Sequence, residues 1–372
     1  MIYLDYNATT PIDKSVADAM QPFLYEHFGN PSSGHAYGLR AREAVETARG
    51  QVADLLGAKP SEIVFTSGGS ESNNTVIKGV AHTLRGKGNH IITSQVEHPA
   101  VLNPCRFLEK NGYEITYLPV DKYGSVSPDN VAAAITKKTT LVTIMHANNE
   151  TGTIQPISKI SSICRQKGVL LHTDAAQSVG KIPTRVNDLG VDFLSIAGHK
   201  LYAPKGIGAL YIREGVSIEP LIHGAGHENG RRAGTENVVF DVGLGKACEI
   251  ASELMEVKTI QALTEYFLNE LRKHFGDKIR LHGHPIVRLP NTLYIGFWGL
   301  TTDAVLTALD DVAVSTGSAC HSGATSISSV LKAMGISESD AGATIRFSLG
   351  RYTTQTEINA VLGKLSKIQE VS

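Results

Sequence analysis

Several protein classes are excluded by what the sequence has little of. Its 372 residues include only four cysteines, none in a C-x-x-C pair, which excludes a disulfide-rich scaffold and leaves no cysteine motif for zinc. Basic and acidic side chains number 35 and 36, so the chain has no basic excess that would attract nucleic acid or an anionic membrane. We therefore expect no metal, nucleic-acid or membrane partner.

Long apolar runs are absent as well. No stretch reaches the roughly 18 apolar residues that span a membrane. No apolar core of a signal peptide follows Met1, and Asp5 already introduces a charge. We therefore expect a cytoplasmic protein in a reducing compartment. Hydrophobic residues still make up 42% of the chain, which at this length is enough to bury a large core without a disulfide or a metal.

The part of the sequence from residue 62 to residue 213 alternates short apolar runs with longer segments of helical spacing. The runs predict strands at Ile63–Thr66, His90–Ser94, Glu114–Val120, Thr140–His146, Val169–Thr173 and Phe193–Ile196. The segments between them predict helices at Glu71–Leu84, Pro99–Lys110, Pro128–Ile135 and Ile157–Gln166. This alternation is typical of βαβ units in a mostly parallel sheet, and consecutive apolar positions indicate strands covered on both faces.

The flanking segments predict further helices and a second, smaller domain. Helical spacing is found at Lys14–His27, at Tyr37–Leu56 and, beyond a glycine- and charge-rich loop at 224–237, over 238–274. The remaining sequence predicts strands at Thr292–Phe297, Val312–Ser315 and Thr344–Leu349, with helices at Asp303–Leu309 and from Thr354 onward. We expect a large domain over residues 14–255 and a smaller α+β domain from residues 1–13 and 256–372, with a binding cleft between them.

A lysine and an aspartate stand at the ends of two neighbouring strands. Lys200 follows the run that ends at Ile196, and Asp174 follows the preceding run, one strand and one connection earlier. In α/β sheets these strand ends face the ligand. Pyridoxal phosphate requires such a pair, because the lysine binds the cofactor covalently and the carboxylate keeps the pyridine nitrogen protonated. Each residue alone would more often be ordinary surface or turn; the joint arrangement carries the prediction.

A seat for a phosphate group is predicted after the first strand of this part. There the sequence FTSGGSESNN, residues 65–74, reads as a strand, a glycine turn and the start of a helix. Free backbone N–H groups at a helix start, together with the helix dipole, attract anions. Gly69 permits close approach of the backbone, and Ser70 adds a hydroxyl donor.

With these motifs together, the chain resembles the cysteine desulfurases of the NifS and IscS type. The resemblance runs from YLDYNATTP at residues 3–11 to IRFSLGR at residues 345–351 and covers nearly the whole chain. It implies an α/β, aspartate-aminotransferase-like fold of pyridoxal-phosphate-dependent transferases. That fold has a large, mostly parallel seven-stranded sheet domain and a smaller α+β domain. It also implies pyridoxal 5'-phosphate as the cofactor and L-cysteine as the substrate.

The resemblance implies roles for individual residues around the cofactor ring. Lys200 matches the lysine that bonds the cofactor covalently, and Asp174 matches the partner of the pyridine nitrogen. Gln177 matches the side chain that bonds the phenolic oxygen. His98 matches the histidine stacked over the ring, a candidate for proton transfer. Asn149 matches an asparagine near the ring and the substrate.

Other matches concern the phosphate and the substrate. The family's phosphate contacts fall on three positions of this sequence, Gly69, Ser70 and His199. Thr235 matches a threonine that reaches the phosphate of the neighbouring subunit, which implies a homodimer with shared active sites. The substrate carboxylate is assigned to Asn30 and Arg346, and arginine suits this role because of its two-pronged geometry.

Cys320 matches the catalytic cysteine of the family. Its neighbours are small and polar, in the sequence GSACHSGATS at residues 317–326, which is typical of a loop. The other cysteines lie in apolar, helix-like segments and are predicted to be buried: Cys105, Cys164 and Cys248. The resemblance implies that the Cys320 thiolate takes sulfur from L-cysteine as a persulfide, leaves L-alanine, and passes the sulfur to an acceptor protein for iron–sulfur clusters, other thio-cofactors or tRNA thiolation.

Three alternatives remain open on the sequence. A selenocysteine lyase would use the same cofactor machinery, and Cys320-His321-Ser322 resembles the loop of those enzymes. An aminotransferase on the same fold would have no use for Cys320. A non-catalytic sulfur-relay protein would keep the fold, but Lys200 and Asp174 would then have no role.

Overall fold

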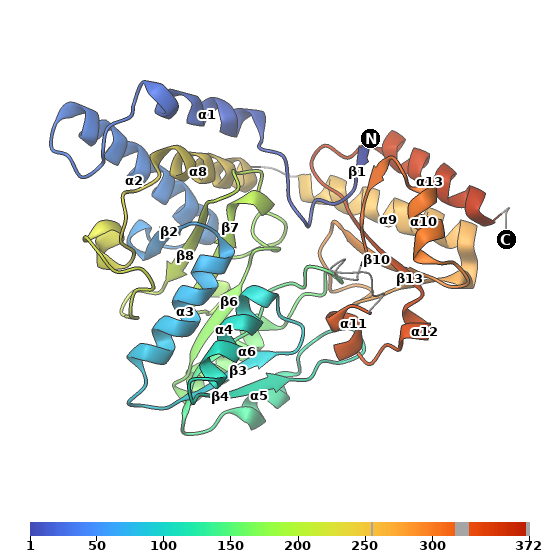
Figure 1. The fold of residues 1–372 in the computed structure, drawn as a ribbon, viewed down its shortest axis with the longest axis horizontal. Helices are drawn as coiled ribbons and strands as arrows, with labels where there is room; N and C mark the ends of the chain where they lie inside the picture. Colours follow the sequence, from blue (N-terminus) through green and yellow to red (C-terminus); the bar gives the residue numbers. More distant parts are fainter. Residues whose placement is uncertain (254–255, 317–326, 370–372) are drawn as a thin grey trace.

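The structure is a computed structural model that describes residues 1–253, 256–316 and 327–369. Its elements gather in two parts, a large one around a seven-stranded sheet and a small one around a four-stranded sheet (Figure 1). The N-terminus and the last helix, α13 (Gln355–Gln369), both lie in the small part. No helix of the described residues is long and apolar enough to cross a membrane.

The large sheet confirms the predicted fold class. Its strands follow the order β2 (Ile63–Thr66), β8 (Gly208–Ile212), β7 (Phe193–Ala197), β6 (Leu170–Asp174), β5 (Thr139–Thr143), β3 (His90–Ser94) and β4 (Glu114–Leu118). β8 runs antiparallel to both of its neighbours, and the other adjacent strands run parallel. β8 was absent from the six predicted runs because Gly208 and Ala209 open it and weaken its β-branched signature.

Helices cover both faces of the large sheet. On one face lie α2 (Ala36–Leu56), α6 (Ile157–Lys167) and α8 (Val238–Glu253), and on the other lie α3 (Gly69–Thr83) and α4 (Pro99–Glu109). Neighbouring residues of one strand therefore enter different cores: Ile92 packs with the first group and Ile91 with the second. This two-sided burial is the physical reason for the consecutive apolar positions of the sequence. Three further helices complete this part: α1 (Lys14–Tyr25), α5 (Pro128–Ala134) and α7 (Val186–Leu189).

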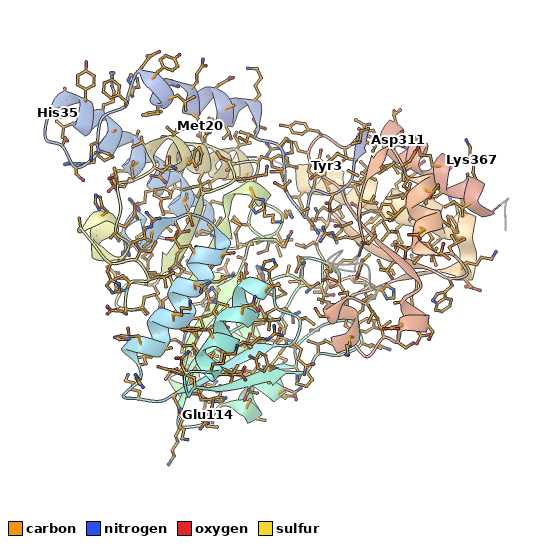
Figure 2. All side chains as sticks on the ribbon, viewed as in Figure 1. Tyr3, Met20, His35, Glu114, Asp311 and Lys367 are labelled. Carbon is orange, nitrogen blue, oxygen red and sulfur yellow. The ribbon has the colours of Figure 1, made fainter. Side chains whose placement is uncertain are left out.

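The small part is built around an antiparallel sheet in the order β12 (Ser315–Thr316), β13 (Ala343–Ser348), β10 (Thr292–Phe297) and β9 (Ile279–Leu281). A separate parallel pair joins β1 (Ile2–Tyr3) to β11 (Val312–Ala313). Its helices are α9 (Glu256–Phe275), α10 (Thr302–Ala308), α11 (Ser329–Ala333), α12 (Glu338–Ala341) and α13. Figure 2 places Tyr3 and Asp311 in this part, where the Ile2 amide donates to the Asp311 carbonyl at 2.9 Å.

Two predicted elements are each divided in the structure. The helical stretch over 238–274 forms two helices, because α8 packs on α1 and α2 while α9 buries its apolar side in the core of the small part. The strand predicted at Val312–Ser315 is shared between two sheets, with β11 beside β1 and β12 beside β13. The predicted domain division at residues 13/14 and 255/256 stays a prediction.

The N-terminal segment crosses from the small part to the large one. Leu4 belongs to the small core, and the Asn7 amide donates to Ser348 Oγ of β13 at 2.9 Å. Three residues later the Thr10 amide donates to the carbonyl of His199 at 2.9 Å. Asp13 then caps α1 by accepting from the Ser15 amide. Residues 7–10 therefore lie along the junction of the two parts, beside the end of β7.

The core of the small part offers a test of its packing. Phe347 of β13 is fully buried, and its ring meets Phe267 of α9 edge-on with 5.1 Å between centroids. We expect Phe347→Ala to lower the free energy of unfolding by about 3–5 kcal/mol, because it removes the ring and leaves a cavity. Urea denaturation followed by circular dichroism measures this loss. The control is Phe107→Ala, a phenylalanine that is 51% exposed, where a change within about 0.5 kcal/mol is expected. Equal effects of the two variants would contradict the assignment of Phe347 to the core.

Candidate active site

A cavity of about 320 Å³ opens where the parallel strands of the large sheet end. Asp174 is the last residue of β6 and Ala197 is the last residue of β7. Nine of the residues predicted from the sequence line this cavity: Gly69, Ser70, His98, Asn149, Asp174, Gln177, His199, Lys200 and Arg346. Ligands of α/β folds bind at this edge of the sheet, so the cavity is the candidate active site.

Lys200 lies in a single 3₁₀ turn, Gly198–Lys200, that directly follows β7. Its ammonium donates to the carbonyls of Asn7 at 2.5 Å and Ala8 at 2.6 Å. Burial lowers the pKa of Lys200 to about 8, and the positive charge of Arg346 adds to this effect, while Asp5 and Asp174 oppose it. A substantial fraction of the amine is therefore neutral near pH 8, as a nucleophile or a base must be.

Asp174 is held by two donors on the floor of the cavity. Asn73 Nδ2 donates to one carboxylate oxygen at 2.7 Å, and the Ala176 amide donates to the other at 2.9 Å. Asn73 is fully buried on the first turns of α3, and its own Oδ1 has no hydrogen-bond partner among the described residues. Sequence analysis assigned Asn73 no role, because its contact with Asp174 joins elements about one hundred residues apart.

A second carboxyl group, that of Glu97, is buried near Asp174. It accepts from Ser94 Oγ at 2.6 Å and from the Met145 amide at 3.0 Å. Burial raises the pKa of Glu97 to about 8, and the negative charge of Asp174 raises it further. At neutral pH Glu97 therefore carries its proton and adds no second negative charge beside Asp174.

His98 lies between Glu97 and the proline that starts α4. Its Nδ1 accepts the Ala100 amide at 3.1 Å, which places the proton of the neutral ring on Nε2. The cavity walls desolvate the ring and lower its pKa, and the charge of Lys200 lowers it further against the opposing effect of Asp174. His98 is therefore a neutral imidazole on the cavity wall that can exchange a proton at Nε2.

The predicted phosphate seat is the N-terminus of α3, a helix of 15 residues. Gly68, just before it, has a φ of 144°, a conformation that glycine adopts far more readily than other residues. Gly69 and Ser70 form the first turn, where backbone N–H groups have no partner within the helix. His199 lies on the same cavity, and its Nδ1 is 3.1 Å from Thr9 Oγ1. Burial and the charges of Lys200 and Lys205 lower the pKa of His199 to about 4.

Arg346 of β13 brings a cation into the cavity from the small part. One terminal nitrogen donates to the Asn149 carbonyl at 2.9 Å and the other to Asp5 Oδ1 at 2.7 Å. Its Nε is buried without a partner among the described residues. The two hydrogen bonds use two of the five N–H groups of the guanidinium, and Arg346 lines the cavity, as the holder of a small carboxylate must.

Gln177 is held from two sides. Its Nε2 donates to the Asn7 carbonyl at 3.0 Å, and its Oε1 accepts from Lys181 Nζ at 3.1 Å. Asn7 and Lys181 were not predicted as functional residues. These two residues contact Gln177 through hydrogen bonds, and the contact between Asn7 and Gln177 joins segments far apart in the sequence, so sequence spacing does not reveal it.

Two predicted residues lie outside the cavity of this chain. Asn30 is exposed before α2 and accepts the Ser32 amide at 2.9 Å. Thr235 is exposed in the segment between residue 230 and α8. Cys320 lies outside the described residues, and the roles of all three stay predictions. The other cysteines are buried as predicted, and burial raises the pKa of each thiol to about 12: Cys105, Cys164 and Cys248.

The cavity fits pyridoxal phosphate in four chemical respects. It offers an amine of lowered pKa at Lys200, an oriented carboxylate at Asp174, a helix N-terminus at Gly69 and Ser70, and a guanidinium at Arg346. The described residues contain no group of three or more histidine, cysteine, aspartate or glutamate side chains placed to hold a metal ion.

The raised pKa of Glu97 predicts a pH dependence of stability. From about pH 4.5, where a free glutamate ionises, to about pH 8, folded Glu97 keeps a proton that the unfolded chain has lost. Its contribution to the free energy of unfolding should therefore fall with rising pH by up to about 1.4 kcal/mol per unit, and level off above pH 8. Glu97→Gln should remove this contribution, as measured by urea denaturation from pH 5 to pH 9. The control is Glu43→Gln, at an exposed glutamate; a wild-type pH slope in Glu97→Gln would refute the assignment.

Comparisons with known proteins agree with this site. The family model for class-V aminotransferases matches residues 2–361. The chain is 52% identical over 373 residues to cysteine desulfurase IscS of Dictyoglomus turgidum, covering 99% of this chain and 94% of that protein. It is 46% identical to the human cysteine desulfurase, covering 100% of this chain and 83% of that protein.

Solved structures give the same relationship. A NifS-like protein superposes with a TM-score of 0.92 at 38% identity, over the full length of both chains. SspA, solved in complex with cysteine, superposes with a TM-score of 0.86 at 41% identity, covering 95% of this chain and all of that one. The fold, the cavity and these relatives agree, and the chain belongs to the class-V aminotransferase family, among the cysteine desulfurases of the NifS and IscS type.

Proposed function

We propose that the protein is a pyridoxal-phosphate-dependent cysteine desulfurase that converts L-cysteine to L-alanine and keeps the sulfur as a persulfide on Cys320. The observation that carries this proposal is the meeting of Lys200, Asp174 and Arg346 in one cavity. That SspA was solved with cysteine supports the same substrate here.

Six residues hold the cofactor in this proposal. Lys200 binds it covalently, Asp174 bonds its pyridine nitrogen, and Gln177 bonds its phenolic oxygen. The phosphate takes the backbone of Gly69, the hydroxyl of Ser70 and a contact with His199. When bound, pyridoxal phosphate withdraws electrons from the α-carbon of the substrate.

The substrate carboxylate is assigned to Arg346 and, on the family resemblance alone, to Asn30, while Asn149 lines the same cavity as Arg346. The Asn149 carbonyl and the Asp5 carboxylate fix the two terminal nitrogens of the guanidinium. The guanidinium is therefore held in place before substrate arrives. This preorganisation lowers the cost of ordering the side chain on binding.

Proton transfer is assigned to Lys200 and His98. The Lys200 amine would accept the α-proton of the substrate, for which its pKa of about 8 is well matched. His98 can donate a proton from Nε2, because its Nδ1 is occupied by the Ala100 amide.

Sulfur transfer is assigned to Cys320. Its thiolate attacks the sulfur of the substrate, so that an S–S bond forms as the substrate's C–S bond breaks. The electron pair of the broken bond stays with carbon, which takes a proton to become the methyl group of alanine. Cys320 keeps the persulfide and transfers it to an acceptor protein that supplies iron–sulfur clusters, other thio-cofactors or tRNA thiolation.

Assembly and location complete the proposal. The exposed position of Thr235, away from the cavity of its own chain, suits a residue that reaches the phosphate of a partner subunit in a homodimer. A reducing compartment such as the cytoplasm keeps the Cys320 thiol available.

The central test separates proton transfer from sulfur transfer. We expect Lys200→Ala to abolish alanine formation from L-cysteine. Cys320→Ala should still bind the cofactor, but it should form neither a protein persulfide nor alanine at the wild-type rate. Alanine is measured by chromatography and the persulfide by mass spectrometry. Lys205→Ala and Cys105→Ala are the matched controls and should keep both products.

Two results would contradict the proposal. Full alanine production by Cys320→Ala would favour aminotransferase-type chemistry. Negligible turnover of L-cysteine beside rapid turnover of L-selenocysteine would favour a selenocysteine lyase.

The role of Arg346 predicts a change in substrate affinity. Arg346→Gln should raise the KM for L-cysteine by about 10- to 100-fold, because a charge-assisted hydrogen bond to the carboxylate is lost. Steady-state kinetics measures this change, and Arg280→Gln, at an exposed arginine of β9, is the control. An unchanged KM with a reduced kcat would show that Arg346 does not hold the substrate carboxylate.

A further inference from the structure

Lys181 does not line the cavity itself but contacts Gln177, which does, and it has no acidic partner among the described residues. Its Nζ donates to Gln177 Oε1 at 3.1 Å and to Asn7 Oδ1 at 3.2 Å. The charged groups that act on it are Lys200 and Arg346, both of them cations, and together with burial they lower the pKa of Lys181 to about 7. Because the nearby charges are cations, the charge of Lys181 gains no favourable ion pair. The role of Lys181 is therefore sought in its hydrogen bonds.

These hydrogen bonds determine which way the Gln177 amide faces. As an ammonium, Lys181 can only donate, so it requires the oxygen of Gln177 on its side. The Asn7 carbonyl can only accept, and it takes one hydrogen of Gln177 Nε2 at 3.0 Å. A flipped amide would set donor against donor at Lys181 and acceptor against acceptor at Asn7. The second hydrogen of Nε2 therefore remains for the cavity that Gln177 lines.

We propose that Lys181 is a positioning residue that fixes the Gln177 amide so that its N–H group faces the phenolic oxygen of the cofactor. This inference rests on the proposed function, because it concerns the cofactor contact assigned to Gln177. Lys181 itself touches neither cofactor nor substrate.

The positioning does not depend on the charge of Lys181. A neutral amine still has two hydrogens for the two oxygens that it contacts, and an ammonium has three. A neutral amine also has a lone pair, but the Asn7 carbonyl can only accept, so the Gln177 amide keeps its orientation on both sides of the pKa of Lys181, which is about 7. A binding preference that depends on Gln177 should show little change across this pH range.

The test compares two ligands that differ at the phenolic oxygen. Protein freed of cofactor is titrated with pyridoxal phosphate and with its 3-O-methyl ether, and the ratio of the two affinities is measured by fluorescence. In the wild type the ratio favours pyridoxal phosphate, because the Gln177 N–H bonds the free oxygen. We expect Lys181→Met to lower this ratio by about tenfold, the worth of one hydrogen bond. Gln177→Leu should lower it as much, and the double variant no further.

The controls separate positioning from a structural role. Lys181→Gln keeps a donor and should retain most of the preference, and Lys181→Ala replaces Lys181→Met if the latter does not fold. A wild-type ratio in Lys181→Met, or an equal loss of affinity for both ligands, would overturn the inference. Failure of the wild type to bind pyridoxal phosphate at all would instead overturn the proposed function.

Discussion

The buried side chain and backbone of Asn7 join the two parts of the molecule at the active site. Toward the small part, the Asn7 amide donates to Ser348 Oγ and its Nδ2 donates to Thr292 Oγ1, both at 2.9 Å. Toward the large part, its carbonyl accepts from Lys200 and Gln177. Asn7, which is 1% exposed, thus donates hydrogen bonds to the small part and accepts them from the large part. The spacing between Lys200 and Gln177 on one side of the cavity and Arg346 on the other depends on this link.

Most of the ionisable groups around the cavity are either shifted in pKa or held by hydrogen-bond or ion-pair partners. Of the two neighbouring carboxyl groups, Glu97 keeps its proton at neutral pH, and Asp174 is held by two donors. Of the cations, Lys200 and Lys181 have lowered pKa values. Arg346 is paired with Asp5. Burial separates groups of the same chemical type, as the proposed roles of a lysine base and an arginine anchor require.

Much of the fold and of the cavity could be predicted from the sequence, and the misses have physical causes. Strands such as Ile63–Thr66 and His90–Ser94 were found to the residue, because burial on both faces leaves an unbroken apolar run. β8 was missed because small residues open it. Asn7, Asn73 and Lys181 were missed because their roles lie in hydrogen bonds between distant segments. The roles of Asn30, Thr235 and Cys320 rest on the family resemblance alone.

The pairing of β1 with β11 has a consequence for the time at which the site forms. Ile2 pairs with Val312, and Asn7 reaches Ser348 across 341 residues of sequence. During synthesis the first residues of the chain can therefore form these contacts only after β11 and β13 have been synthesised. Contacts between residues so far apart in the sequence also form slowly. The large sheet can assemble from local βα units in the meantime. The cavity acquires its wall from the small part last, so the growing chain does not hold a complete active site until β13 has emerged.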